Sequence, residues 1–353
     1  MGNKLSIVCI TYNQGLFIRQ ALNSFLMQKT NFPFEIIIGD DCSIDATPVI
    51  IKEYAKKYPE IIKPILREEN IGATQNFVGT LSRVKTKYLA ICEGDDYWTD
   101  PYKLQKQVDF LESHPEYSAC FHSVKVIWEN GEYPDSMYPN ANTMMRLGNK
   151  VTLKELLKQN LIQTNSIVYR WRFSDCDVKN YFPDGILPGD WYVHLLHAQV
   201  GDIAYLPETM AVYRRNSGGI WYDKDPQNRN LHLKHGVREI KFYMNVWENI
   251  ANRSEEYWKQ ILPEITNIMN IYYKNGNIEK LQEIKSLYPN IFEQIFNISE
   301  QEFKTDKGIF FKSLEQTQKK YKKYKKLFNI FLYISISLLF MFAISISLIL
   351  KKN

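Results

Sequence analysis

The 353-residue sequence predicts an α/β fold: a doubly wound, mainly parallel sheet flanked by helices, then a helical region and one C-terminal transmembrane helix. Three observations support this prediction. Apolar strand patterns alternate with helical patterns through residue 128, which is typical of a parallel sheet with crossover helices. Only helical patterns follow from about residue 226, and residues 327–350 contain neither a charge nor a proline.

The predicted strands are apolar, β-branched runs bounded by turn residues. They are expected at 5–11, 34–39, 61–66, 88–92, 117–128, 166–170, 203–206 and 210–213. Helices are expected where apolar residues recur at helical spacing, at 18–26, 47–58, within 70–84, at 100–111, after Thr152 and at 189–200. Thr152 and Glu155 form a capping-box pattern.

Polar residues follow the predicted strands at the points where the strands end. They are Tyr12–Asn13, Asp40–Asp41 and Glu93–Asp96. Ligands bind parallel sheets outside the carboxyl ends of the strands, so we expect these side chains to share one crevice.

Carboxylates are concentrated in the turn that contains Glu93, Asp95 and Asp96. Such a cluster is costly unless a cation or hydrogen-bond donors neutralise it, and oxygen ligands select Mg²⁺ or Mn²⁺. Gly94 would allow the tight backbone that brings these carboxylates together. The alternative is a capped surface turn, because Asp is favoured in turns.

The segment after the second strand, Asp40-Asp41-Cys42-Ser43, is suited to accept hydrogen bonds from a nucleotide base or ribose. A dinucleotide-dependent enzyme is an alternative, because a sheet of this type can also bind a dinucleotide. It is disfavoured, because the first strand is followed by Tyr12-Asn13-Gln14-Gly15 and not by the glycine-rich GxGxxG loop.

The net charge of +5 comes from the C-terminus, because residues 312–326 contain seven Lys and one Glu. The rest of the chain is mildly acidic, so no nucleic-acid partner is expected. As a helix, 327–350 would span roughly 36 Å, against a hydrocarbon core of about 30 Å. The preceding lysines place the main body in the cytoplasm by the positive-inside rule, as a membrane-anchored protein without a signal peptide. A buried core helix is the alternative.

The chain resembles the family 2 glycosyltransferases of the GT-A fold, of a bacterial type with a C-terminal membrane anchor. The segments that carry the resemblance are SIVCITYN (6–13), EIIIGDDCSIDAT (35–47), REENIGATQNF (67–77), YLAICEGDDYWTDPYKLQKQ (88–107), LPGDWYVHLLHA (187–198) and MAVYRRNSGGIW (210–221). Any one motif is weak, but the ordered set is specific. The resemblance implies a GT-A domain over 1–225, and we expect a helical extension at 226–312, a basic juxtamembrane helix at 313–326 and the membrane helix at 327–350.

The resemblance also implies roles for individual residues. The nucleoside would be held by Asp41, with Thr11 and Asn13 nearby. Asp95 would coordinate a divalent ion on the donor diphosphate, with support from Glu93 and Asp96. Asp190 would be the general base, although an N-cap of its helix is the structural alternative. Arg214 and Arg215 would face the diphosphate or close the loop.

Two residues depart from the family pattern. Glu93 stands where Asp is usual, and Asn216 stands where the closing loop often has His, which puts a metal contact from that position in doubt. The implied function is metal-dependent, inverting transfer of a sugar, with a UDP-sugar expected as donor, to a glycan or lipid-linked acceptor. The alternative is a non-catalytic nucleotide-sugar-binding module. Four aromatic residues are candidates for sugar stacking or for ordinary packing: Trp98, Trp191, Trp221 and Tyr222.

Overall fold

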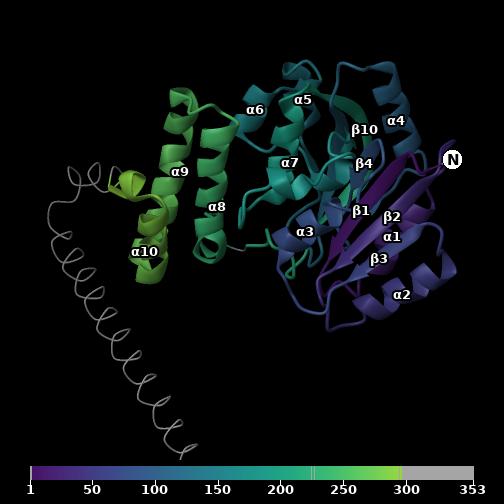
Figure 1. The fold of residues 1–353 in the computed structure, drawn as a ribbon, viewed down its shortest axis with the longest axis horizontal. Helices are drawn as coiled ribbons and strands as arrows, with labels where there is room; N and C mark the ends of the chain where they lie inside the picture. Colours follow the sequence, from purple (N-terminus) through teal and green to yellow (C-terminus); the bar gives the residue numbers. More distant parts are fainter. Residues whose placement is uncertain (1, 224, 226, 294, 296–353) are drawn as a thin grey trace, which may run out of the picture. The chain divides into compact units, whose positions relative to one another are not determined.

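The computed structural model describes residues 2–223, 225, 227–293 and 295 (Figure 1). The described chain divides into two compact units, one ending at Ile271 and the other beginning at Tyr272. Among the described helices, none has the length and apolar character needed to cross a bilayer. The expected helices at 313–326 and 327–350 lie outside the described residues, as does the part of the helical extension from 296 onward.

One mixed sheet of ten strands organises the first unit, with the order β3-β2-β1-β4-β9-β6-β10-β5, while β7 pairs with β6 and β8 with β10. The strands are β1 (Leu5–Thr11), β2 (Phe34–Asp40), β3 (Ile62–Leu66), β4 (Tyr88–Ile91), β5 (Tyr97–Trp98), β6 (Ala119–Trp128), β7 (Ser136–Tyr138), β8 (Lys150–Val151), β9 (Val168–Arg170) and β10 (Ile203–Arg215). The strands predicted before residue 130 are all present, with ends shifted by at most two residues.

The parallel part of the sheet is the part that the strand and helix alternation predicted. β1 pairs in parallel with both β2 and β4, and β2 pairs in parallel with β3. β9 differs, because it lies antiparallel between β4 and β6. The sheet is therefore mixed, and its carboxyl edge on the β3-β2-β1-β4 side collects the ends of four parallel strands.

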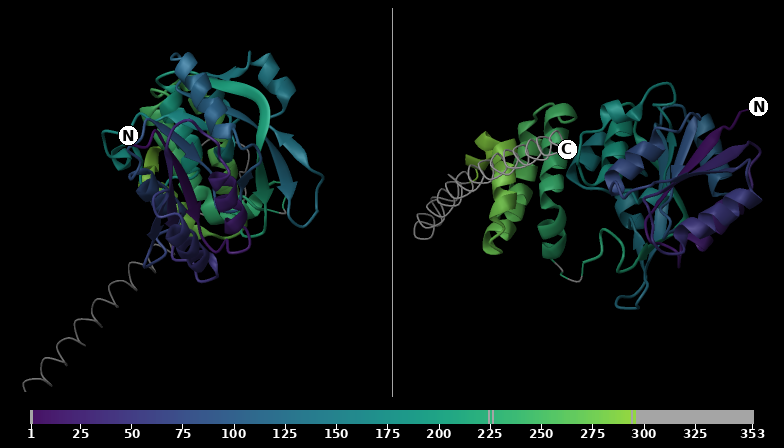
Figure 2. Two further views of the ribbon diagram at one scale, coloured as in Figure 1. Left: turned by 90° about the vertical axis from the view of Figure 1, so that its right-hand side faces the viewer. Right: turned by 60° about the horizontal axis from the view of Figure 1, so that its bottom comes forward.

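The two short strands expected at 203–206 and 210–213 are one strand, β10. Its pairing with β6 shifts register between Leu206 and Thr209 and again between Thr209 and Val212. The Pro207-Glu208 break in the apolar pattern marks this irregularity and does not end the strand, since a bulge accommodates extra residues within a ladder. Figure 2 shows β10 as a long, bent strand.

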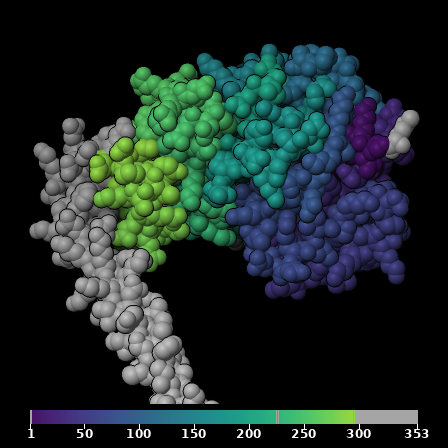
Figure 3. Space-filling model, in the orientation of Figure 1, coloured from purple at the N-terminus to yellow at the C-terminus, as the bar shows by residue number. Residues whose placement is uncertain are grey.

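The helices are α1 (Ile18–Leu26), α2 (Thr47–Lys57), α3 (Ala73–Leu81), α4 (Lys103–Ser113), α5 (Ala141–Arg146), α6 (Leu153–Lys158), α7 (Gly189–Ala198), α8 (Arg229–Asn249), α9 (Glu255–Lys274) and α10 (Ile278–Leu287). Two short 3₁₀ turns lie at Thr164–Ser166 and Val178–Tyr181. The capping box predicted for Thr152 and Glu155 is present at the start of α6. The described segments of the first unit run from purple through teal to green in the space-filling view (Figure 3).

The main hydrophobic core joins one face of the sheet to the helices that follow its strands. Alternate residues of β1, including Ile7 and Cys9, are fully buried in the same cluster as Phe25 of α1 and Leu104 of α4. Each large apolar side chain buried in this way contributes about 1.5–3 kcal/mol. This packing confirms the predicted burial of the apolar strand residues and fixes the strand ends where the polar residues begin.

Helix α3 packs closely on the other face of the sheet because β2 has a glycine at the contact. A Cβ atom on Gly39 would lie 2.1 Å from the hydroxyl oxygen of Thr80, which is far closer than any real contact. The side-chain amide of Asn76 also donates to the Gly39 carbonyl at 2.8 Å. These contacts bring the start of α3 to the carboxyl edge of the sheet.

Candidate active site

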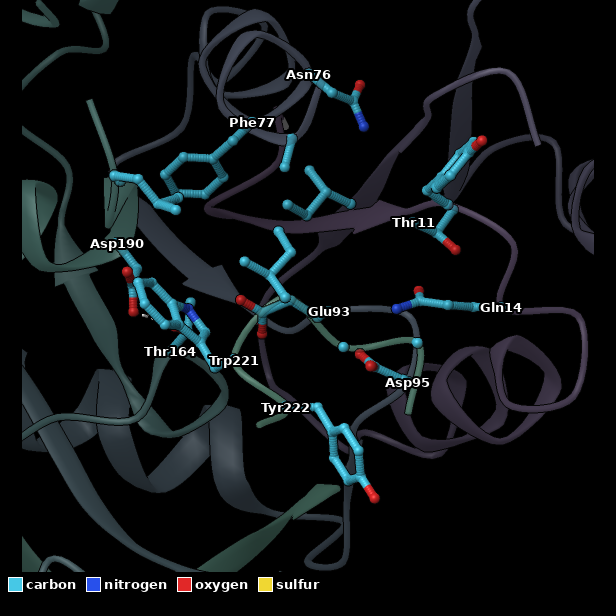
Figure 4. Close-up of a pocket in the computed structure, with 18 of the residues that line it drawn as sticks. Thr11, Gln14, Asn76, Phe77, Glu93, Asp95, Thr164, Asp190, Trp221 and Tyr222 are labelled. Carbon is cyan, nitrogen blue, oxygen red and sulfur yellow. Dashed lines mark hydrogen bonds between the residues drawn. The ribbon is translucent and has the colours of Figure 1, made fainter. Parts of the chain in front are cut away.

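A cavity of about 470 Å³ opens at the carboxyl edge of the sheet (Figure 4). Of the residues singled out from the sequence, it is lined by Thr11, Tyr12, Asp41, Glu93, Asp95, Asp96, Asp190, Arg214, Arg215, Asn216, Trp221 and Tyr222. Its volume lies within the range of about 300–1,000 Å³ that is usual for small-molecule sites. The predicted crevice is therefore present, and distant parts of the chain build it.

Three carboxylates cross the pocket, with Glu93 between Asp190 and Asp95 (Figure 4). Burial, together with the negative charges of Asp190 and Asp95, raises the pKa of Glu93 to about 8. Burial also raises the pKa of Asp95. Both shifts disfavour the ionised carboxylates when no cation is present, so a cation that binds between them would stabilise their charged forms.

Asp190 lies in the first turn of α7, where the N-cap residue is Pro188. Asp190 is therefore not the N-cap residue of α7. Its Oδ2 atom instead accepts a hydrogen bond of 2.9 Å from the hydroxyl of Thr164, in the 3₁₀ turn before β9. The described protein gives no partner to Oδ1, so one carboxylate oxygen is available to a substrate.

Asp95 and Asp96, in the turn after β4, have different hydrogen-bond partners. Asp96 is buried and accepts a hydrogen bond of 2.8 Å from the backbone N–H of Arg214 in β10. Asp95 accepts one of 2.8 Å from the side-chain amide of Asn216. Asp96 therefore fastens β10 to this turn, while Asp95 faces the pocket and the loop that follows β10.

Gly94 allows this turn to lie against the end of β1. A Cβ atom at Gly94 would lie 2.5 Å from Gln14 Oε1 and 2.9 Å from Thr11 Oγ1. Both oxygens are buried and lack a hydrogen-bond partner among the described residues. Buried polar atoms without partners are costly, so these two atoms are suited to receive donors from a bound ligand.

Asp41 organises the loop before α3. Its two carboxylate oxygens each accept a hydrogen bond of 2.9 Å, from the backbone N–H groups of Ile71 and Gly72. Asn13 is absent from the described lining, and its side-chain oxygen accepts a 2.9 Å hydrogen bond from the backbone N–H of Ile44. Asp41 and Asn13 therefore shape the loops around the pocket through backbone contacts.

The two neighbouring arginines of β10 differ in their surroundings. The Arg214 guanidinium donates to Gln20 at 2.7 Å, pairs with Glu129 at 3.1 Å and lies 4.5 Å from the ring centre of Phe17. Arg215 lies 5.0 Å from the ring centre of Trp128. Arg214 is held by protein groups, so Arg215 is the better candidate of the two for contact with a ligand.

The comparisons with known proteins agree with this geometry. Residues 6–175 match the model of glycosyl transferase family 2. This similarity extends over just under half of the chain. Uncharacterised proteins of Mycobacterium tuberculosis and Mycobacterium bovis are each 53% identical over 227 residues, covering 64% of this chain and 63% of theirs. The match thus spans less than two thirds of these relatives.

The S. aureus protein TarS (residues 1–349), solved in complex with UDP, is similar to this chain in structure. It is 19% identical, with a TM-score of 0.50, and the match covers 83% of this chain and 80% of that one. A likeness at this identity shows the fold. The fold is GT-A, an α/β fold with a mixed, mainly parallel sheet followed by a helical region.

The carboxylates of the pocket suit a divalent ion held jointly with a diphosphate. The described residues include no group of three or more His, Cys, Asp or Glu side chains placed to hold a metal ion by themselves. Magnesium-like ions need only one or two protein carboxylates when substrate phosphates and water complete their shell. The half-buried Asp95 and Glu93 meet that requirement, whereas Asp96 is engaged with the backbone of β10.

Several residues of the pocket carry no recognisable sequence motif. Thr164 precedes Asp190 by 26 residues and contacts it only because α7 packs beside the 3₁₀ turn. Lys234, His235 and Arg238 line the pocket from α8, in a region where only a helical pattern was evident. Of the four candidate aromatics, Trp221 and Tyr222 line the pocket, while Trp98 is buried in the core and Trp191 donates to the Leu156 carbonyl.

Proposed function

We propose that this protein is an inverting glycosyltransferase that moves a sugar from a nucleotide-diphosphate sugar, with a UDP-sugar as the expected donor, to an acceptor hydroxyl on a glycan or lipid-linked saccharide. One observation carries the proposal: Asp41, Asp95 and Asp190, from three distant segments, line the same pocket. The family 2 match over residues 6–175 supports the reaction class.

In this proposal Asp190 is the general base. Its carboxylate takes the proton of the acceptor hydroxyl as that oxygen bonds to the anomeric carbon and the bond from that carbon to the diphosphate oxygen breaks. Attack from the face opposite the leaving group inverts the configuration. Thr164 donates to Oδ2 and so orients the carboxylate, which leaves Oδ1 to receive the proton.

The nucleoside would lie against the loop that Asp41 holds, with Thr11 and Gln14 supplying acceptors for its donor groups. Asp95, with Glu93 beside it, would hold Mg²⁺ or Mn²⁺. When bound, the ion supplies positive charge that stabilises the departing diphosphate. Arg215 is placed to add a second positive charge at the pocket wall.

Replacement of Asp190 by Asn tests the proposal. We expect the rate of nucleotide release from a panel of nucleotide sugars to fall by roughly 10²–10⁴-fold, the usual contribution of a positioned base. Binding of UDP, followed by calorimetry, should persist. Asp184→Asn is the matched control, since Asp184 is an exposed acid near the start of the same helix. Turnover that survives Asp190→Asn would refute the role of the base.

The same panel tests the alternative and the metal. A binding module would bind the nucleotide but give no turnover in the unmodified protein. The enzyme proposed here should lose activity in EDTA and recover it with Mn²⁺ or Mg²⁺, because repulsion among the pocket carboxylates and the diphosphate is then unshielded. Activity unaffected by EDTA would remove the metal from the proposal.

We also propose that residues 327–350 anchor the protein in a membrane, with the catalytic domain in the cytoplasm. The support is the sequence alone: an uncharged apolar segment of membrane-spanning length that follows six lysines between Lys319 and Lys326. Anchoring would raise the local concentration of a bilayer-held acceptor. Deletion of 313–353 should release the protein from membranes and reduce transfer to lipid-linked acceptors. Unchanged membrane transfer would contradict this proposal.

A further inference from the structure

One wall of the pocket is basic, although its floor is acidic. Helix α8 contributes Lys234, His235 and Arg238 to the lining. Asp41 and Asp95 come from a different part of the chain, the turns that follow strands β2 and β4. Within the described part of the chain, neither Lys234 nor Arg238 has a carboxylate at ion-pair distance. Lys234 is exposed and Arg238 is partly buried, so both cations can donate charge-assisted hydrogen bonds to an anion in the pocket.

Helix α8 is fixed to the segment that leads into Asp190. The backbone N–H of Leu187 donates to the carbonyl of Arg238 at 3.2 Å. The Arg238 guanidinium donates to Thr74, whose hydroxyl donates in turn to the Ile186 carbonyl at 3.0 Å. Helix α8 is therefore fixed directly to the segment before the proposed base, and through Thr74 it also contacts the start of α3.

The start of α8 is also tied to the loop after β10. Asp223 accepts hydrogen bonds of 3.1 and 3.2 Å from the backbone N–H groups of Asn230 and Leu231. The side chains that face the pocket lie one turn further along the same helix. The backbone that carries them is therefore held in place before any ligand binds, which lowers the entropic cost of recognition.

His235 gives a second, independent sign of a ligand. It is 8% exposed, and its Nε2 atom is buried without a hydrogen-bond partner among the described residues. Burial and the neighbouring charges of Lys234 and Arg238 lower the pKa of His235 to about 4. The ring is therefore neutral near pH 7, and its unpaired nitrogen is available for a neutral hydrogen bond.

We propose that Lys234, His235 and Arg238 form an anion subsite that selects an acceptor carrying a phosphate or a carboxylate. The inference rests on the proposed glycosyl transfer and names the acceptor class for it. Lys234 and Arg238 supply the charge, and Arg238 has further N–H donors beyond the one used on Thr74. His235 supplies a hydrogen bond.

The position of the subsite assigns it to the acceptor and not to the donor. The acceptor hydroxyl must lie against Asp190, and α8 contacts the chain at Leu187, three residues before that base. The proposed donor contacts come from the ends of β1, β2 and β4. An anionic acceptor would otherwise be repelled by the Asp190 carboxylate, so a basic wall near this residue compensates that repulsion.

Calorimetric binding to the full chain, saturated with UDP and Mn²⁺, tests the proposal. The probes are glucose 6-phosphate, glucuronate and glucose, which share a ring and differ in charge. We expect at least one anionic probe to bind at least about tenfold more tightly than glucose, because charge-assisted hydrogen bonds are the stronger kind. Preference between the two anions distinguishes a phosphate-bearing from a carboxylate-bearing acceptor.

The variant Lys234→Gln/Arg238→Gln should abolish that preference while leaving UDP affinity within about twofold. Lys52→Gln, an exposed lysine on α2 outside the pocket, is the matched control and should retain it. Arg238 also contacts Thr74, so the double variant removes that hydrogen bond as well. The single variant Lys234→Gln leaves it intact and should show a smaller loss of the preference for the anionic probe.

Three outcomes would overturn the inference: equal affinity for all three probes, an anion preference that persists in the double variant, or loss of UDP binding in that variant in place of loss of anion preference. The last would assign α8 to the donor. Failure of the proposed function itself is distinct, because the unmodified protein would then release no nucleotide from any nucleotide sugar, whatever its preference among the three probes.

Discussion

The side-chain amide of Asn216 donates a 2.8 Å hydrogen bond to Asp95, although 121 residues separate the two in the chain. The Asn216 oxygen in turn accepts from the backbone N–H of Gly218 at 2.9 Å. One amide therefore joins the loop after β10 to the acidic turn after β4. Where the family resemblance leads one to expect His, this chain uses Asn as a neutral link between the loop and the carboxylate.

Asn216→Ala should lower kcat/KM for nucleotide-sugar turnover by about tenfold, because a buried carboxylate loses a hydrogen-bond donor worth roughly 1–3 kcal/mol and the loop loses its attachment. Steady-state kinetics over a range of donor concentrations would measure it. Ser217→Ala is the control, since Ser217 is the exposed neighbour in the same loop. Equal activities of the two variants would show that the link is dispensable.

Thr164 is a positioning residue, because it acts on the reaction through Asp190. Thr164→Val keeps the shape but removes the hydroxyl, and we expect kcat to fall by about tenfold with donor KM unchanged, as one hydrogen bond to a charged group is lost. Thr164→Ser restores the hydroxyl and should restore most of the rate. A serine variant as slow as the valine variant would mean that packing, and not the hydrogen bond, matters here.

Glu93 makes stability depend on pH in the absence of divalent ions. Its pKa rises from 4.5 to about 8 on folding, so between those values the folded state binds more protons than the unfolded state. The free energy of unfolding should therefore fall as pH rises through this window, by at most about 1.4 kcal/mol per pH unit. The substitution Glu93→Gln should remove this fall in the free energy of unfolding.

Denaturant unfolding in EDTA, repeated at steps of about one pH unit between pH 5 and 8, would measure the effect. The stability of the Glu93→Gln protein relative to the unmodified protein should increase with pH. Glu68→Gln, at an exposed position, should show no such trend. Parallel pH curves for the Glu93→Gln and unmodified proteins would disprove the assigned shift.

Lys103 has the opposite pH dependence. It is fully buried, donates to Gln107 at 2.8 Å and lies 4.3 Å from the ring centre of Trp98. Burial lowers its pKa from 10.5 to about 7, so the unfolded state binds more protons between these values. The free energy of unfolding should rise with pH across this window, because the cost of the buried charge disappears.

Lys103→Met should abolish that rise, so the stability of the variant relative to the unmodified protein decreases from about pH 7 upward, by at most about 1.4 kcal/mol per unit. Denaturant unfolding at three pH values above 7 measures the trend. The exposed Lys85→Met provides the control. A constant difference between Lys103→Met and the unmodified protein would contradict a pKa lowered by burial.

The sequence was sufficient for the parallel half of the sheet and for the place of the site. Strands such as Leu5–Thr11 and Phe34–Asp40 are runs of apolar residues whose ends coincide with polar ones, and this pattern is local. The carboxyl ends of parallel strands meet at one edge, so the joint position of Asp41 and Asp95 followed from strand assignment alone. The antiparallel direction of β9 could not be predicted in this way, because a three-residue strand carries no signal of its direction.

The partners of each side chain were decided by tertiary packing. Nothing near Arg214 in the chain indicates that Gln20 and Glu129 hold its guanidinium, and nothing near Asp190 indicates Thr164. The pocket residues of α8 likewise have the spacing of any exposed helix face. Secondary structure and strand ends follow from periodicity within a few residues, whereas hydrogen bonds between segments dozens of residues apart depend on how the finished elements pack, and no local pattern records that.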